Sequence, residues 1–98
     1  MTFEWQAEAL EEYVESAGYY EEQQEGLGSR FIERVEFALA RMLRNPVTYR
    51  VFERGCRKIR IEPFPYALVY RVADEHIVIV AVMNQHREPG YWHRRLDR

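Results

Sequence analysis

The sequence is poor in the features that mark secreted, membrane-bound and multidomain proteins. Cys56 is the only cysteine among 98 residues, so no internal disulfide framework is available. This scarcity fits a reducing cytoplasm. No apolar run approaches the roughly 18 residues that span a bilayer. The segment 1–5 has neither a basic end nor a long apolar stretch, so we expect no signal peptide. A membrane protein, a disulfide scaffold, a zinc finger and a large multidomain enzyme are excluded.

The composition that remains is typical of one small folded domain. The chain is 47% hydrophobic and 31% charged, which is too apolar for a disordered segment. A chain of this length buries roughly 60–65% of its unfolded surface, enough for one modest core. We therefore expect a single cytoplasmic domain over residues 1–98.

The net charge of −2 hides a division between the two halves of the chain. Residues 1–49 carry ten acidic and four basic side chains, whereas residues 50–98 carry six acidic and ten basic ones. Solvated helix faces and scattered strand charges are the simplest explanation. The alternative is a basic face on the second half that meets phosphates or an acidic protein.

The apolar periodicity predicts two helices. The first begins at Ala7, and the second runs from an N-cap at Ser29 to about Arg44, where Asn45-Pro46 ends it. The apolar positions of the first helix are Leu10, Tyr13, Val14, Ala17 and Tyr20. Those of the second are Phe31, Val35, Ala38, Leu39 and Met42. Because only a short glycine-containing segment joins the helices, we expect an antiparallel hairpin.

Strands are predicted at the start of the chain and throughout its second half. Polar and apolar side chains alternate, or apolar ones predominate, in segments 2–5, 56–62 and 66–72. The segment 76–84 is an apolar run typical of a strand covered on both faces. One or two helical turns are expected after Pro89. The order β-α-α-β-β-β, with a short C-terminal helix, predicts an α+β fold: a helix hairpin packed on a mostly antiparallel four-stranded sheet.

Metal and cofactor chemistry find no support in the residue spacings. His76, His86, His93 and Cys56 lack the spacing of a metal site. The glycines at 26 and 28 form an interhelical turn, not a phosphate-binding loop. We therefore expect neither a metal nor a cofactor, and we interpret Cys56 as an inert strand cysteine.

Basic residues are the more informative candidates for function. Lys58 and Arg60 share one face of a strand because side chains alternate across a sheet, and Arg57 points the other way. Arg87 follows the last strand, where loops present side chains to ligands. The C-terminal segment adds Arg94, Arg95 and Arg98, and the aromatic residues expected in or beside this region are Tyr70, Tyr91 and Trp92.

Guanidinium groups interleaved with aromatic rings are typical of an RNA-binding site. The structural alternative is that Tyr91 and Trp92 cover the sheet and that Arg87 pairs with Glu88 or a helix carboxylate. We favour this packing role for Trp92 and a functional role for Arg87. Metal-free RNA cleavage also needs a general acid and a general base. The candidates near the basic face are His86, Glu62, Glu88 and Tyr91, and no pair among them has a diagnostic spacing.

An ordered set of short motifs extends over nearly the whole chain. The set is Tyr19-Tyr20-Glu21, Gly26-Leu27-Gly28, Phe31, Val35-Glu36, Ala38-Leu39, Asn45-Pro46, Phe64-Pro65-Tyr66, Tyr70, Ala81-Val82, Arg87, Pro89, Tyr91-Trp92 and Arg95. In this order the motifs resemble the RelE/ParE superfamily of bacterial type II toxin–antitoxin toxins, which includes plasmid stabilisation proteins. The fold of that superfamily is β-α-α-β-β-β, often with a C-terminal helix.

The resemblance implies a cognate antitoxin, a toxin–antitoxin hetero-oligomer and no membrane partner. In the gyrase-poisoning branch the toxin traps the DNA–gyrase complex and is not an enzyme. In the ribosome-dependent branch it is a metal-independent endoribonuclease that acts on mRNA. There the catalytic roles would fall on Lys58, Arg60, Arg87 and Tyr91.

The sequence departs from this pattern at Asn84, where close relatives often carry a histidine. Asparagine forms hydrogen bonds but does not exchange a proton near neutral pH. Three hypotheses remain. The first is growth arrest by binding a target such as DNA gyrase, and the second is cleavage of mRNA on the ribosome. The third is a regulatory member that mainly binds its antitoxin.

Overall fold

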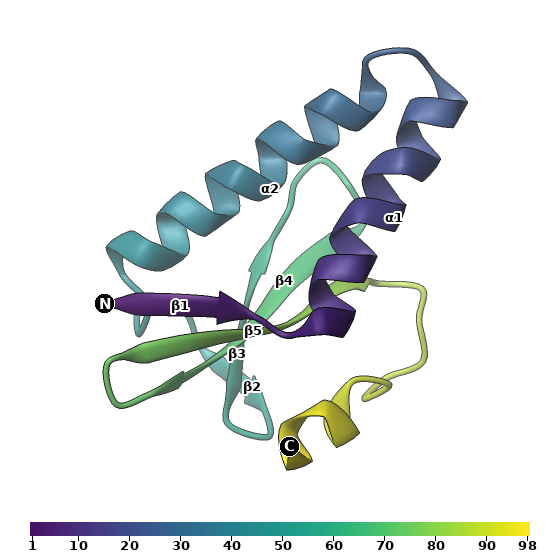
Figure 1. The fold of residues 1–98 in the computed structure, drawn as a ribbon. Coiled ribbons are helices and arrows are strands. Elements are labelled where there is room, and N and C mark those ends of the chain that lie inside the picture. Colours follow the sequence, from purple (N-terminus) through teal and green to yellow (C-terminus); the bar gives the residue numbers. More distant parts are fainter.

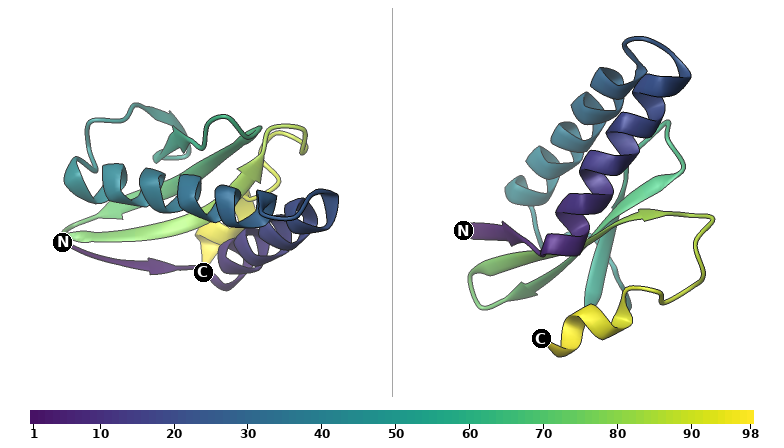
Figure 2. Two further views of the ribbon diagram at one scale, coloured as in Figure 1. Left: turned by 90° about the horizontal axis from the view of Figure 1, so that it is seen from above. Right: turned by 45° about the vertical axis from the view of Figure 1, so that its right-hand side comes forward.

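Five strands and two helices form an α+β fold in the computed structural model, which describes residues 1–98 (Figure 1). The strands are β1 (Thr2–Trp5), β2 (Val51–Glu53), β3 (Cys56–Arg60), β4 (Tyr66–Ala73) and β5 (His76–Asn84). The helices are α1 (Ala7–Gln23) and α2 (Leu27–Arg44), and a 3-10 helix, η1, spans His93–Asp97. The two long helices are antiparallel and lie together against the sheet (Figure 2).

The sheet is mixed and has five strands, so the predicted number of four was wrong, while the prediction of a mostly antiparallel sheet is confirmed. The order is β1-β5-β4-β3-β2, and β1 pairs with β5 in parallel while the other pairs are antiparallel. The missed strand, β2, has three residues and an irregular register with β3. Three residues are too few to show an alternating pattern. The direction of β1 is set by tertiary packing of the hairpin that follows it, which leaves no local signal.

The main core lies between α2 and the sheet. All five apolar positions predicted on α2 are buried, as are Ile59 and Ile61 on the facing side of the sheet. Tyr20 of α1 closes one end of this core by packing on the rings of Phe31 and Phe64. The predicted apolar stripe of α2 is therefore confirmed.

The buried face of α1 matches the prediction in part. Leu10 and Val14 point to solvent, with exposed fractions of 46% and 64%, while Ala9 is buried and Tyr13 stacks on Trp5 at a centroid distance of 5.3 Å. Tyr13, Ala17 and Tyr20 pack against the main core, so the predicted face is confirmed at three of its five positions and wrong at Leu10 and Val14. The small side chain of Ala9 lets α1 approach the sheet closely, and this preference is invisible in an apolarity pattern.

The turn between the helices is organised by Glu21, and α2 begins at Leu27, two residues before the predicted cap at Ser29. The carboxylate of Glu21 accepts hydrogen bonds from the backbone N–H groups of Gly26 and Gly28, at 2.9 and 3.0 Å. It thus satisfies two donors near the start of α2 that lack intrahelical partners. Gly26 has φ of 88°, a left-handed conformation that favours glycine.

Gly28 permits the closest approach of the two helices. A Cβ atom at this position would lie 2.6 Å from the backbone oxygen of Ala17 and 2.9 Å from the Cβ of Glu21. We expect Gly28→Ala to lower the free energy of unfolding by about 1–3 kcal/mol because the helices must separate. Urea denaturation measures this change. Gly18→Ala is the control, since nothing lies within 4 Å of the added Cβ; equal stability of the two variants would contradict the close contact.

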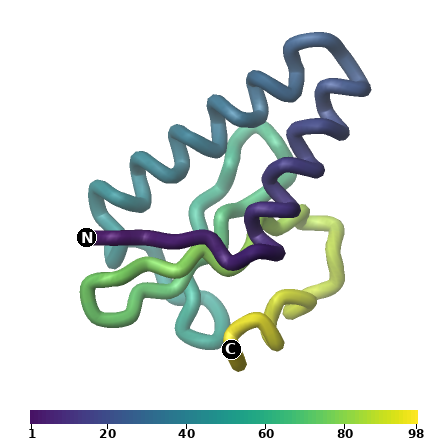
Figure 3. Tube along the Cα trace, in the orientation of Figure 1, coloured from purple at the N-terminus to yellow at the C-terminus, as the bar shows by residue number.

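A second, smaller core covers the opposite face of the sheet. Trp92 is fully buried there and packs with Cys56, Val69, Val80 and Ala81. The chain reaches this position because the segment after β5 turns back beneath the sheet and ends near the start of α1 (Figure 3). The sheet is therefore covered by the hairpin on one side and partly by the C-terminal segment on the other. No helix is long and apolar enough to cross a membrane.

Candidate functional site

Two of the predicted site residues meet in a depression on the sheet face opposite the hairpin. Lys58 of β3 and Arg87, which follows β5, both line this depression, whose volume is about 300 Å³. The full lining is Phe52, Glu53, Lys58, Met83, Asn84, Gln85, Arg87, Pro89, Gly90 and Trp92. As predicted, a cation of a strand, Lys58, and a cation of a loop, Arg87, therefore lie at the same place on the surface.

Lys58 and Arg60 project from the same face of β3, as their spacing predicts, but they line different parts of it. The Nζ atom of Lys58 lies 4.6 Å from the ring centroid of Phe52. Arg60 is paired with Glu62 at 3.6 Å and lines a groove between β3 and α2. Both partners of this ion pair are about two-thirds exposed, so the pair contributes little to stability. Lys58 borders the groove as well as the depression.

Arg87 is positioned by a tight turn after β5. The side-chain oxygen of Asn84 accepts a hydrogen bond from the N–H of His86 at 2.8 Å, and the carbonyl of Asn84 accepts one from the N–H of Arg87 at 3.1 Å. The guanidinium of Arg87 then lies over the ring of Tyr91, 4.0 Å from its centroid. Asn84 therefore has a turn-forming role, and no ion pair with Glu88 or a helix carboxylate neutralises Arg87.

The hydroxyl of Tyr91 also has a partner. Its hydroxyl donates a hydrogen bond to Oε2 of Glu12 at 2.9 Å. Burial, followed by the charge of Glu12 and this hydrogen bond, raises the pKa of Tyr91 well above its usual value of 10. The hydroxyl is therefore neutral near pH 7, and it is held by a structural partner.

Glu12 also binds Arg95 of the C-terminal segment. Arg95 donates two hydrogen bonds to its carboxylate, at 3.0 and 2.9 Å, and one to the carbonyl of Val80 at 2.9 Å. Arg98 is paired with Glu8, which lies on α1 like Glu12. These two arginines fasten the C-terminal segment to α1, so they are not part of the depression. Arg94 is exposed.

The remaining candidates are dispersed. Tyr70 lies in the main core, on the hairpin side of the sheet, where its hydroxyl donates to the carbonyl of Pro46 at 2.6 Å and burial raises its pKa to about 12. Its expected place beside the basic face was wrong. Arg57 points away from Lys58 and donates to the carbonyls of Val47 and Tyr49.

A carboxylate–imidazole pair beside the depression was not predicted from the sequence. Nε2 of His93 lies 3.3 Å from Oε1 of Glu53, and Glu53 lines the depression with Lys58. Gly90 makes room for the imidazole, because a Cβ there would lie 2.6 Å from the His93 ring. Forty residues separate the pair, and Glu53 belongs to the strand that pattern analysis missed, so no local signal connects them.

No group of three or more His, Cys, Asp or Glu side chains is placed to hold a metal ion. Cys56 is buried beneath Trp92, and burial raises the pKa of its thiol. A thiol held in the neutral form is a weak nucleophile and a weak ligand.

The structure defines a small α+β protein with an open cationic depression on the sheet face opposite the hairpin. The chain matches the family described as the ParE toxin of the type II toxin–antitoxin system, parDE, over residues 3–89, and it belongs to that family. The fold is similar to that of a solved chain of the chromosomal ParDE toxin–antitoxin system from P. aeruginosa. That similarity has a TM-score of 0.71 and 18% sequence identity, and it covers 86% of this chain and 95% of the other. No curated protein has a matching sequence.

Proposed function

We propose that this ParE-family toxin arrests growth by trapping DNA gyrase on DNA, and that a cognate antitoxin neutralises it. Family membership is the observation that carries the proposal. The depression supports a binding role, because Lys58 and Arg87 are free of carboxylate partners and open to a macromolecular ligand. Asn84 and Tyr91, which occupy the positions expected of acid–base groups, are held in structural hydrogen bonds.

Brief induction of the toxin in growing cells tests this proposal. We expect growth to stop and gyrase-linked DNA breaks to accumulate, while primer extension finds intact mRNA. Cuts in mRNA at ribosome-dependent positions, with no DNA breaks, would contradict it. The absence of any growth effect would leave only the regulatory role.

Arg87→Ala tests the part played by the depression. We expect this variant to lose most of its toxicity with little change in stability, because Arg87 is solvent-facing and its stacking on Tyr91 contributes only about 0.5–1 kcal/mol. Growth after induction and the thermal unfolding midpoint are the two measurements. Arg54→Ala, an exposed arginine in the β2–β3 turn, is the control. Full toxicity of the Arg87 variant would assign this residue a structural role.

The outer side of the helix hairpin is the surface that we propose for the antitoxin. Leu10 and Val14 lie one turn apart on α1, and Ile32 and Leu43 share a face of α2, and all four are exposed. The hydrogen bond from Tyr13 to Glu36 places these two faces beside the seam between the helices. Exposed apolar side chains in such a row are typical of a site for a partner helix or extended segment.

A charge placed in this row tests the antitoxin surface. We expect Val14→Asp to abolish neutralisation by co-expressed antitoxin while leaving toxicity unchanged. Val47→Asp is the matched control, because Val47 is 62% exposed, close to the 64% of Val14, and lies outside the hairpin. Normal neutralisation of the Val14 variant, or no gain in thermal stability of the wild-type protein with its antitoxin, would refute the assignment.

Ribosome-dependent cleavage of mRNA is the second candidate function, and the Glu53–His93 pair is the observation that favours it. Glu53 and two cations line one depression, and the His93 imidazole contacts Glu53. Metal-independent RNA cleavage uses such a set of groups. If the toxin cleaves mRNA, we expect His93→Gln to abolish the mRNA cuts after induction. If the toxin traps gyrase, we expect the same variant to poison gyrase as well as the wild type does.

A further inference from the structure

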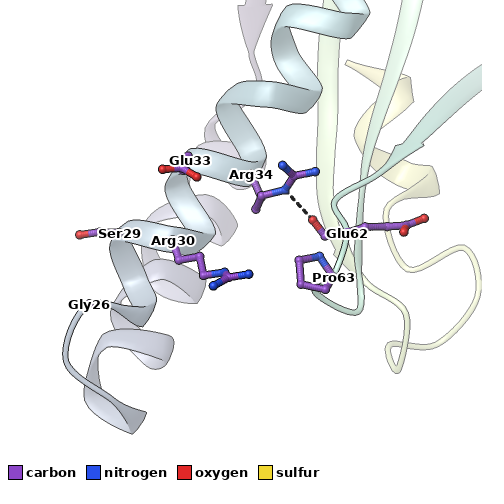
Figure 4. A pocket seen from close by; sticks show the side chains of 7 residues that line it. All are labelled: Gly26, Ser29, Arg30, Glu33, Arg34, Glu62 and Pro63. Carbon is purple, nitrogen blue, oxygen red and sulfur yellow. Dashed lines mark hydrogen bonds between the residues drawn. The ribbon is translucent and has the colours of Figure 1, made fainter.

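A second basic surface lies between α2 and the β3–β4 side of the molecule. We call it the α2–β3 groove and define it by its cations, Arg30, Arg34, Arg41, Lys58 and Arg60. It consists of two adjoining depressions, of about 600 and 370 Å³, which share Arg34 and Glu62. Figure 4 shows Arg30 and Arg34 reaching from α2 toward the loop at Pro63.

Carboxylates neutralise little of this charge. Glu33 and Glu62 are the acidic side chains that line the groove. In Figure 4 Glu33 points away from Arg30, and the Glu62 carboxylate points away from α2. Arg34 uses its Nε atom to donate to the carbonyl of Glu62 at 2.7 Å, which leaves its two terminal nitrogens free. Only Arg60 has a carboxylate partner, at 3.6 Å.

Aromatic rings hold several of these cations in place. The guanidinium of Arg34 lies 4.6 Å from the centroid of Phe37. Arg41 lies between Phe37 and Tyr49, at 5.9 and 5.4 Å from their centroids. Stacking of this kind orients a cation before a ligand arrives, so less side-chain entropy is lost on binding.

The lining of the groove indicates the chemistry of its partner. None of the residues that line the larger depression is hydrophobic, whereas a protein partner normally inserts apolar or aromatic anchors into pockets. The rings of Phe37 and Tyr49 contact Arg34 and Arg41, so in this groove they orient cations. Several cations that are oriented in advance, and of which only Arg60 has a carboxylate partner, match a row of backbone phosphates.

We propose that the α2–β3 groove binds the phosphate backbone of duplex DNA without reading its sequence. The inference rests on the proposed function in one respect, since gyrase supplies the duplex that the groove contacts in the cell. Lys58 borders both the groove and the depression that contains Arg87. The toxin thereby contacts DNA along one edge while the depression faces the enzyme that holds the DNA.

Binding of a fluorescent DNA duplex to the purified toxin, measured against salt concentration, tests the groove directly. Each phosphate contact contributes about −0.9 to the slope of log K against log salt. With five cations engaged, the wild-type slope should be roughly −4 to −5. The double variant Arg30→Gln/Arg41→Gln should reduce the magnitude of this slope by about 2. Both residues are exposed and lie outside the Lys58–Arg87 depression.

The matched control is Arg54→Gln/Arg94→Gln, which removes the same charge from exposed positions outside the groove. We expect its slope to equal that of the wild type, and circular dichroism verifies that all three proteins are folded. The proposal is overturned if the two double variants have the same slope. It is also overturned if single-stranded RNA or a polyglutamate peptide binds more tightly than duplex DNA.

The same proteins separate this inference from the proposed function. Wild-type toxin that binds duplex DNA through the groove but causes no gyrase-linked breaks would refute the gyrase target and support the groove. Toxin that causes breaks, with unchanged DNA affinity in the Arg30/Arg41 variant, would support the gyrase target and refute the groove.

Discussion

Glu12→Ala should lower the free energy of unfolding by about 3–5 kcal/mol, the cost of breaking a largely buried ion pair by removing one partner. The side chains of Glu12 and Arg95 are only 16% and 11% exposed. The carboxylate accepts hydrogen bonds from Tyr91, from Arg95 and from the backbone N–H of Val82. Its loss leaves the guanidinium of Arg95 with only the carbonyl of Val80 as a partner, and the N–H of Val82 with none. Urea denaturation at neutral pH measures the change.

Two comparisons isolate the contribution of this ion pair. Glu11→Ala alters an exposed neighbour on the same helix and should change stability by no more than about 0.5 kcal/mol. In a double-mutant cycle, Glu12→Ala and Arg95→Ala should be strongly non-additive, because each removes the partner of the other. Additive effects would mean that the two residues stabilise the protein independently.

Trp92→Ala should be comparably severe, at about 3–5 kcal/mol. The indole is fully buried in the second core, where it packs against Phe52 and His93 at centroid distances of 5.8 and 4.6 Å. Removing it also takes away part of the lining of the depression that contains Lys58 and Arg87. We therefore expect toxicity to fall together with the thermal unfolding midpoint.

Trp92→Phe tests whether packing, as opposed to hydrogen bonding, explains that loss. The indole N–H is buried and has no hydrogen-bond partner, so replacing it with a ring carbon removes no bond. This variant should recover much of the lost stability. Equal destabilisation by phenylalanine and alanine would show that the ring itself contributes little.

Elements with a sustained periodicity were the predictable part of the fold. The stripe of α2 and the apolar run of β5 are long enough for burial to impose a clear pattern on the sequence, and both are confirmed. β2 has three residues and an irregular register, so it carries no comparable pattern. Two of the five positions predicted on α1, Leu10 and Val14, are exposed. Ala9 is buried and Leu10 exposed because the fit of a helix against the sheet depends on side-chain size as well as apolarity.

The same distinction applies to the candidate site. The shared face of Lys58 and Arg60 follows from strand alternation, which is a local property. The capture of Arg95 by Glu12 and the pairing of His93 with Glu53 join residues 83 and 40 positions apart. Such contacts depend on where the C-terminal segment returns to the body of the protein, and single-sequence patterns do not contain that information.

Purified gyrase, relaxed or supercoiled plasmid and the purified toxin provide the most direct test of the proposed function. We predict that the toxin causes protein-linked DNA breaks to accumulate, that Arg87→Ala greatly reduces them and that the cognate antitoxin prevents them. Normal gyrase turnover with no breaks at saturating toxin, together with cleavage of mRNA on purified ribosomes, would contradict the assignment of gyrase as the target.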